Sequence, residues 1–159
     1  WATNPMEQFD TGYSIKTLMN AIVEPNALKI WQAVRYVATI DGVQEDVSPQ
    51  SNEDWARLRI NAITLVEAGN ALMIEGRVAN STAPEEVYPD YMYRAEEIQV
   101  LIETNFEVWG SYVQEMQFST QATLDAIERR DVLGLIKTGA RINNACEGCH
   151  ADFWYRRDI

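Results

Sequence analysis

The chain has 159 residues, of which 47% are hydrophobic, and we expect a single globular domain over residues 1–159. Its formal net charge is −11, from 24 acidic and 13 basic residues. This balance argues against nucleic acid or an anionic membrane surface as a partner, and it is compatible with a basic protein partner. No apolar run approaches the length of about 18 residues that a membrane span needs, so we predict none.

The first residue is Trp1, without an initiating Met. We interpret this as a mature chain from which a leader peptide has been removed, although a shortened chain would begin in the same way. The two cysteines are too few for a disulfide scaffold.

The first two helices are predicted from apolar positions at helical spacing. Residues 11–39 carry one such stripe, in which Pro25 predicts a kink and not a break. Residues 40–50 predict a loop. The second helix follows a capping box of Ser51 and Asp54, and its stripe has steps of three and four: Trp55, Leu58, Ala62, Leu65, Gly69, Leu72 and Gly76.

Two more helices follow a loop predicted over residues 79–89. The third runs from about residue 90 to residue 129, and the fourth begins at a predicted N-cap, Asp131. Strand-type alternation is absent from the sequence. Four helices with short connections predict an all-α fold, an antiparallel four-helix bundle. The inward stripe of the fourth helix contains both cysteines: Val132, Leu135, Gly139, Ile142, Cys146, Cys149 and Phe153.

The stretch "CEGCH" holds both cysteines, Cys146 and Cys149, and the only histidine, His150. C-x-x-C-H is the attachment signature of c-type haem, in which each cysteine forms a thioether to one vinyl group and the histidine binds the iron. A thioredoxin-like dithiol would need a βαβ context, and a structural zinc site would need a fourth ligand; the sequence offers neither. The cluster therefore predicts one covalent haem c. It also favours a periplasmic location, because in bacteria this attachment occurs beyond the inner membrane.

The segment "RRDVLGLIKTGARINNACEGCHADF", residues 129–153, resembles the last helix of the cytochrome c′ and cytochrome c-556 family, the class II c-type cytochromes. The resemblance extends to the layout of the whole chain, and Phe153 matches the aromatic residue three positions after the histidine. It implies a four-helix bundle with the haem site on the C-terminal helix. Trp154 departs from the family, which usually carries Lys or Arg beside the proximal imidazole.

The distal face of the haem is covered in this family by the start of the first helix, where this chain has Leu18, Met19 and Ile22. The resemblance leaves two alternatives. Met19 binds the iron as in cytochrome c-556, or Leu18 or Met19 forms an apolar lid over a five-coordinate iron as in cytochrome c′. A second histidine ligand from the same chain is excluded, because His150 is the only one.

These alternatives imply different functions. Ligation by Met19 and His150 suits outer-sphere electron transfer with redox partner proteins in the periplasm. A five-coordinate iron behind an apolar lid would instead bind NO or CO. A third hypothesis is a structural bundle whose cysteines form only a redox pair. No catalytic constellation is recognisable, so we do not predict an enzyme.

Other residues are weaker candidates for contacts with the haem. Arg141, with Arg156 or Arg157, could pair with the propionates or be solvated at the surface. Aromatic residues at or near inward positions could pack the edge of the porphyrin or fill the core: Trp31, Trp55, Trp109, Tyr112, Phe153 and Trp154.

Two surface features could bind proteins. Residues 91–93, Tyr-Met-Tyr, form either a docking patch or the packed start of the third helix. The small residues Ala62, Gly69 and Gly76 would permit a homodimer through close helix approach, or they face the core.

Overall fold

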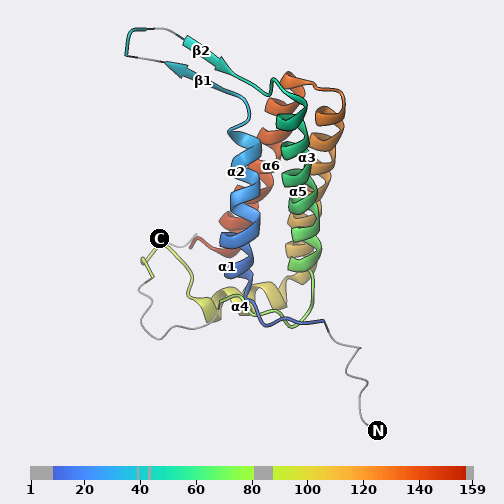
Figure 1. Ribbon diagram of the computed structural model, residues 1–159. Coiled ribbons are helices and arrows are strands. Elements are labelled where there is room, and N and C mark those ends of the chain that lie inside the picture. The colour runs from blue at the N-terminus through green and yellow to red at the C-terminus, as the bar shows by residue number, and fades with distance from the viewer. Residues whose placement is uncertain (1–8, 39, 43, 81–87, 157–159) are drawn as a thin grey trace.

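The computed structural model describes residues 9–38, 40–42, 44–80 and 88–156, and over these the chain is mainly helical. Figure 1 shows α2, α3, α5 and α6 side by side, α4 across one end, and the hairpin β1–β2 projecting from the other. The predicted all-α class is therefore confirmed for the helical body. The elements in chain order are α1 (Ile15–Leu18), the π-helical turn η1 (Met19–Val23), α2 (Glu24–Trp31), β1 (Arg35–Ala38), β2 (Gln44–Val47), α3 (Asn52–Leu72), α4 (Ala95–Thr104), α5 (Phe106–Glu128) and α6 (Val132–Phe153).

One apolar core joins the helices. α5 packs against α3 and α6, and α2 packs against the same two helices. Full burial of one large apolar side chain stabilises a fold by about 1.5–3 kcal/mol. The helices α1, α3, α4, α5 and α6 each contribute at least one fully buried large apolar side chain, and α2 adds buried Ile30. The largest of these fully buried side chains are Trp109, Ile15, Leu65, Ile98 and Ile142.

The irregularity predicted at Pro25 is a π-helical turn. The N–H of Glu24 donates to the carbonyl of Met19, five residues earlier, and the regular helix α2 follows. In a regular helix the proline ring would collide with the carbonyl four residues before it, and proline has no N–H to donate. The wider turn before Pro25 avoids this collision, so the helix continues to Trp31 without a break.

After Trp31 the structure differs from the prediction. β1 and β2 form an antiparallel hairpin in which Arg35 lies opposite Val47. The helix predicted over residues 11–39 therefore ends early, and the loop predicted over residues 40–50 contains a strand. The sequence of β1 contains an aromatic residue, Tyr36, and a β-branched residue, Val37, and both types favour extended backbone. This preference overrides the helical spacing of Val34 and Val37 on which the prediction was based.

The predicted third helix, residues 90–129, is two helices. α4 begins only at Ala95, and the backbone breaks at Asn105, where φ is −123° and ψ is 39°. The backbone N–H and the side-chain amide of Asn105 both donate to the carbonyl of Leu101, at 3.0 Å each. An asparagine side chain that competes for a helix carbonyl in this way ends a helix, and spacing of apolar residues does not reveal it.

The second and fourth predicted helices are confirmed with their caps. The Ser51 hydroxyl accepts the N–H of Asp54 at 3.1 Å, and the Asp54 carboxylate accepts the N–H of Ser51 at 2.9 Å. At the start of α6, the Asp131 carboxylate accepts the N–H of Gly134 at 2.8 Å. Gly76, which was assigned to the second helix, lies beyond its end with φ of +79°.

The small residues of α3 lie within the chain's own core. Ala62 is fully buried, and a Cβ on Gly69 would lie 2.7 Å from the Gln117 side chain of α5. The Gln117 amide donates to the carbonyl of Val66 and to the side-chain oxygen of Asn70, at 2.9 Å each. Ala62 and Gly69 therefore lie inside the chain's own core and give no support to a homodimer, which stays a prediction.

Replacing Asp131 by Ala removes the N-cap of α6, and we expect the free energy of unfolding to fall by about 1 kcal/mol. Urea denaturation measures this change. Asp125→Ala, on the exposed side of α5, is the matched control and should alter stability by less than about 0.5 kcal/mol. An equal loss in both variants would contradict a specific role for the cap.

Candidate functional site

Both cysteines and the histidine line one cavity of about 400 Å³ near the C-terminal end of α6. Residues from α1, η1, α2, α3, α5 and α6 form its walls, together with Met92 from the segment before α4. Met19 lines the same cavity as Cys146, Cys149 and His150, although it lies more than 120 residues before them in the sequence. The volume falls within the range of about 300–1,000 Å³ typical of small-molecule and cofactor sites.

The two cysteines lie in the last two turns of α6. Cys149 is 7% exposed, Cys146 is half-buried, and neither forms a disulfide. Residues three apart lie on the same side of a helix, so both thiols share the face that carries Ile142 and Phe153. The inward stripe predicted for this helix therefore brings both thiols to the cavity.

Burial keeps both thiols protonated. It raises the pKa of Cys146 from its ordinary 9.0 to about 11, with a smaller contribution from the neighbouring Glu147 carboxylate. It raises the pKa of Cys149 to about 12, with a smaller contribution from Cys146. Reactive dithiols need the opposite shift, which the N-terminus of a helix provides. These cysteines lie at the negative C-terminal end of α6, an arrangement that disfavours a thioredoxin-like redox pair.

Met19, the first residue of η1, is the residue of the predicted distal set that reaches the cavity. π-helical turns are frequent at functional sites, because they change which side chains face a neighbour. Met19, Val23 and Ala27 recur every four residues along the wall. Leu18 is buried in the core and Ile22 packs against it, and neither belongs to the cavity lining in the described part of the chain.

Phe153 lies behind the cavity wall. Its ring is 2% exposed and meets Trp109 edge-on at 5.5 Å and Tyr112 edge-on at 6.5 Å between centroids. Trp109 and Tyr112 both line the cavity. Edge-to-face pairs contribute about 0.5–1.5 kcal/mol beyond burial. Phe153 therefore supports the cavity through these two rings without lining it.

Arg141 does not line the cavity and is exposed, so of its two predicted roles the structure favours the surface residue over the haem contact. Five residues before Cys146, it lies about 140° around the helix axis from that cysteine. Its guanidinium is 3.3 Å from the Glu115 carboxylate and 5.4 Å from the centre of the Phe118 ring. Lys16 is the one Lys or Arg in the lining that the structure describes.

The tail after α6 is tied to the segment before α4. The N–H of Tyr93 donates to the carbonyl of Trp154, and the N–H of Arg156 donates to the carbonyl of Tyr91, at 2.9 Å each. The Arg156 guanidinium also pairs with both oxygens of Glu97, at 2.6 and 2.8 Å, so it is not a propionate partner. Arg157 lies outside the described residues.

This pairing brings Met92 to the cavity lining, which no pattern in the sequence predicted. No periodicity links two segments about 60 residues apart, so only their backbone pairing could reveal the contact. Tyr91, the neighbour of Met92, is 57% exposed and its ring centroid lies 6.4 Å from that of Tyr155.

Trp154 lies next to His150, with ring centroids 6.2 Å apart, and it lines the cavity. The carbonyl of His150 accepts the N–H groups of Trp154 and Tyr155 at 2.8 and 3.1 Å. The end of α6 is therefore closed by the tail itself.

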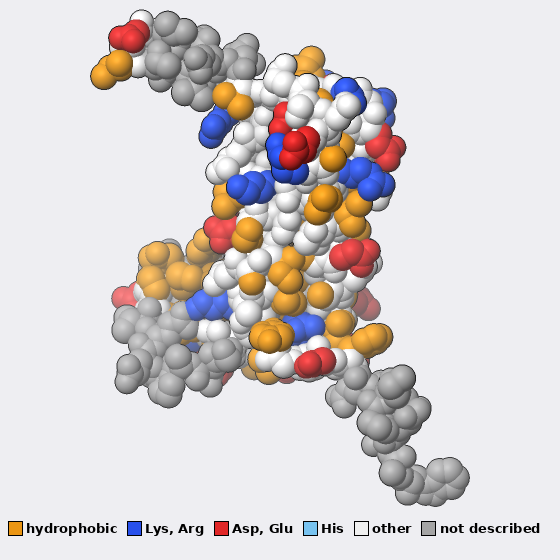
Figure 2. Space-filling view, viewed as in Figure 1, with side chains coloured by type: hydrophobic (Ala, Val, Ile, Leu, Met, Phe, Trp, Pro, Cys, Tyr) orange, Lys and Arg blue, Asp and Glu red, His pale blue; other side chains and the backbone are white. Residues whose placement is uncertain are grey.

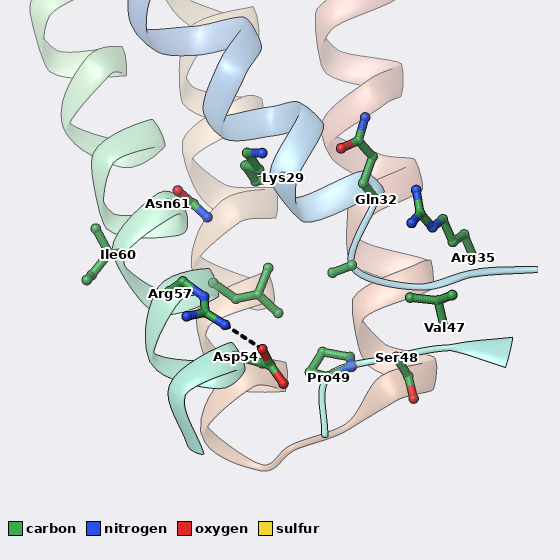
Figure 3. Close-up of a pocket in the computed structure, with 12 residues that line it drawn as sticks. Lys29, Gln32, Arg35, Val47, Ser48, Pro49, Asp54, Arg57, Ile60 and Asn61 are labelled. Carbon is green, nitrogen blue, oxygen red and sulfur yellow. Dashed lines mark hydrogen bonds and ion pairs between the residues drawn. The ribbon is translucent and has the colours of Figure 1, made fainter. Parts of the chain in front are cut away.

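A second depression, of about 520 Å³, lies between the end of α2, the base of the hairpin and the start of α3 (Figure 3). Its Arg57 already pairs with Glu53 and Asp54, at 2.5 and 2.7 Å. The N–H and hydroxyl of Ser51 and the N–H of Gln50 hold the pKa of the Asp54 carboxyl well below its usual range. These charges fix the start of α3, and the described lining contains no cysteine, histidine or aromatic residue.

The face drawn in Figure 2 carries charges of both signs. In Figure 2, acidic and basic side chains are interspersed over the helices, and no patch of one sign covers this face. No described helix combines the length and the low polarity that crossing a membrane requires. The described residues also contain no cluster of three or more His, Cys, Asp or Glu side chains that could hold a metal ion.

Comparison of the chain with family models, with curated proteins and with solved structures gave no match. The candidate site therefore depends on the geometry of this chain alone. Its distinguishing feature is the meeting of Cys146, Cys149, His150 and Met19 in one cavity.

With both thiols free, Cys146 should react with iodoacetamide at pH 8 on the order of 100-fold more slowly than in the denatured chain, since its pKa is raised from 9.0 to about 11. The rate should climb until the pH exceeds about 11. The folded chain favours the neutral thiols over the thiolates. The contribution of the neutral thiols to stability is complete below pH 9 and is lost as the pH rises through 11 to 12. A rate profile with a midpoint below pH 9 would contradict the burial.

Proposed function

We propose that this chain is a mono-haem c-type cytochrome of the class II type, in which the long helices form an antiparallel four-helix bundle. Cys146 and Cys149 would hold one haem through thioethers, and His150 would bind the iron on the proximal side. The observation that carries the proposal is that all three residues of the C-x-x-C-H motif line one cavity at the end of α6, and that Met19 lines it too. The resemblance of residues 129–153 to the last helix of class II cytochromes supports the same conclusion.

The residues that line the cavity fit a haem chemically. Thioether formation adds each S–H across a vinyl double bond, which consumes no oxidant and needs two thiols that are not joined in a disulfide. Leu72, Trp109 and Val113 supply apolar and aromatic wall, which suits the porphyrin. Lys16 replaces Arg141 as the candidate cation for the carboxylates at the rim.

Bound haem would supply a one-electron iron couple, and the chain's own residues would set its properties. His150 donates an imidazole nitrogen, and Met19, on the adjacent helix, is the candidate sixth ligand, a pair that raises the reduction potential. The net charge of −11 would steer a basic redox partner toward the protein. The proposed activity is electron transfer in the periplasm, without catalysis of a further reaction.

A second candidate function follows if Met19 does not bind the iron. On this side the cavity wall combines apolar Met19, Val23 and Ala27 with polar Asn20 and acidic Glu24. An open iron position facing such a wall would favour neutral diatomic molecules, NO or CO, over anions. The two functions differ in one measurable property, the coordination number of the iron.

Expression of the full chain with a c-type maturation system should give one covalently bound haem per chain, measured as the pyridine haemochrome after acid–acetone extraction. The double variant Cys146→Ala, Cys149→Ala should retain none, because both thioethers are removed. Arg141→Ala, whose side chain points away from the cavity, should keep full attachment. Absence of covalent haem in the unaltered chain would refute the proposed function.

Met19→Ala should abolish the weak near-infrared band of Met-to-iron ligation and lower the reduction potential by on the order of 100 mV. Met73→Ala is the matched control, because Met73 packs against Gly110 and does not belong to the described lining. If the unaltered protein lacks the band, and its ferrous form is high-spin and binds CO, the second function replaces the first.

A further inference from the structure

Tyr112 of α5 touches the C-terminal end of α6 at three points. Its hydroxyl donates to the carboxylate of Asp152 at 2.5 Å. Its ring meets Phe153 edge-on, with centroids 6.5 Å apart. A Cβ built on Gly148 would lie 2.8 Å from the nearest ring carbon of Tyr112. The three contacted residues of α6 are those immediately around His150, at positions −2, +2 and +3.

The contact at Gly148 depends on the absence of a side chain. Real Cβ atoms essentially never approach another heavy atom as closely as 2.8 Å, so Ala at this position would displace the ring. Glycine is the least favourable residue in a helix interior apart from proline. Its presence between the two cysteines is explained here by the passage of the Tyr112 ring, because the C-x-x-C-H spacing itself makes no demand on residue 148.

We propose that Tyr112 is a positioning residue, which clamps the last turn of α6 between Gly148 and Phe153 and thereby fixes the orientation of His150. The ring limits movement of the turn toward α5 at Gly148, and the hydroxyl holds Asp152 one half-turn beyond His150. Tyr112 also lines the cavity, so the clamp acts at the face where the imidazole is presented. Its consequence for the iron rests on the proposed function, but the clamp itself is a property of the haem-free chain.

The decisive variant is Tyr112→Phe, which keeps the ring and removes the hydroxyl. Two measurements on the haem-free full chain report on the turn. One is the alkylation rate of Cys149; the other is the imidazole NMR signal of isotope-labelled histidine, which is unambiguous because His150 is the only histidine. We expect alkylation about fivefold faster, as loss of one partly buried hydrogen bond allows, and a shifted His150 signal.

Three further variants control this result. Tyr91→Phe deletes the hydroxyl of an exposed tyrosine outside the described cavity lining and should leave the alkylation rate unchanged. Gly148→Ala should reproduce the effect of Tyr112→Phe, because it pushes the ring away from Asp152. Asp152→Asn retains an acceptor oxygen for the Tyr112 hydroxyl, so it should raise the alkylation rate of Cys149 less than Tyr112→Phe does. This comparison keeps the test decisive even if another variant fails to fold.

In the haem-loaded protein, Tyr112→Phe should also shift the ferric EPR signal, since that signal depends on the orientation of the axial imidazole. A Tyr112→Phe variant whose alkylation rate and His150 signal equal those of the unaltered chain would overturn the clamp, as would an unchanged EPR signal in the loaded variant. Failure to attach haem would instead refute the proposed function and leave the measurements on the haem-free chain to decide the clamp.

Discussion

The packing of α5 against the last two turns of α6 is the interaction on which the candidate site depends. Trp109 and Tyr112 meet Phe153 edge-on, and Tyr112 passes over Gly148. Trp109 and Tyr112 line the cavity together with both cysteines, and Phe153 packs behind the two rings. Large rings lose little rotamer freedom for the area that they bury, so a few of them hold a wall in place. The same helix pair thus forms the core and presents both thiols and the imidazole.

The opposite wall depends on a backbone constraint. Pro25 cannot donate an N–H and its ring cannot fit against a regular preceding turn, so the chain widens into η1. Each residue of a regular helix turns by about 100°, so a change in the local hydrogen-bond pattern alters which side chains face a neighbour. In this segment Met19 faces the cavity, Leu18 lies in the core and Ile22 packs against the core.

The electrostatics of the cysteines separates the chemical hypotheses. Buried thiols at the C-terminal end of a helix are neutral and poorly nucleophilic at ordinary pH, which is unfavourable for disulfide exchange. Neutral, unjoined thiols beside an apolar and aromatic wall suit covalent attachment of a large planar cofactor. The periplasmic setting and the redox partner stay proposals, and the Met19 experiment decides between electron transfer and binding of a diatomic ligand.

The amino-acid sequence by itself determined the features that depend on near neighbours. The caps at Ser51 and Asp131, the stripes of α3 and α6, and the delivery of Cys146 and Cys149 to one face follow from helix periodicity and local hydrogen bonding. Only the tertiary structure decided the hairpin, the break at Asn105, the direction of Arg141 and the entry of Met92. The physical reason is that these depend on competition between local backbone preferences or on pairing between distant segments, and apolar spacing along one helix carries no information about either.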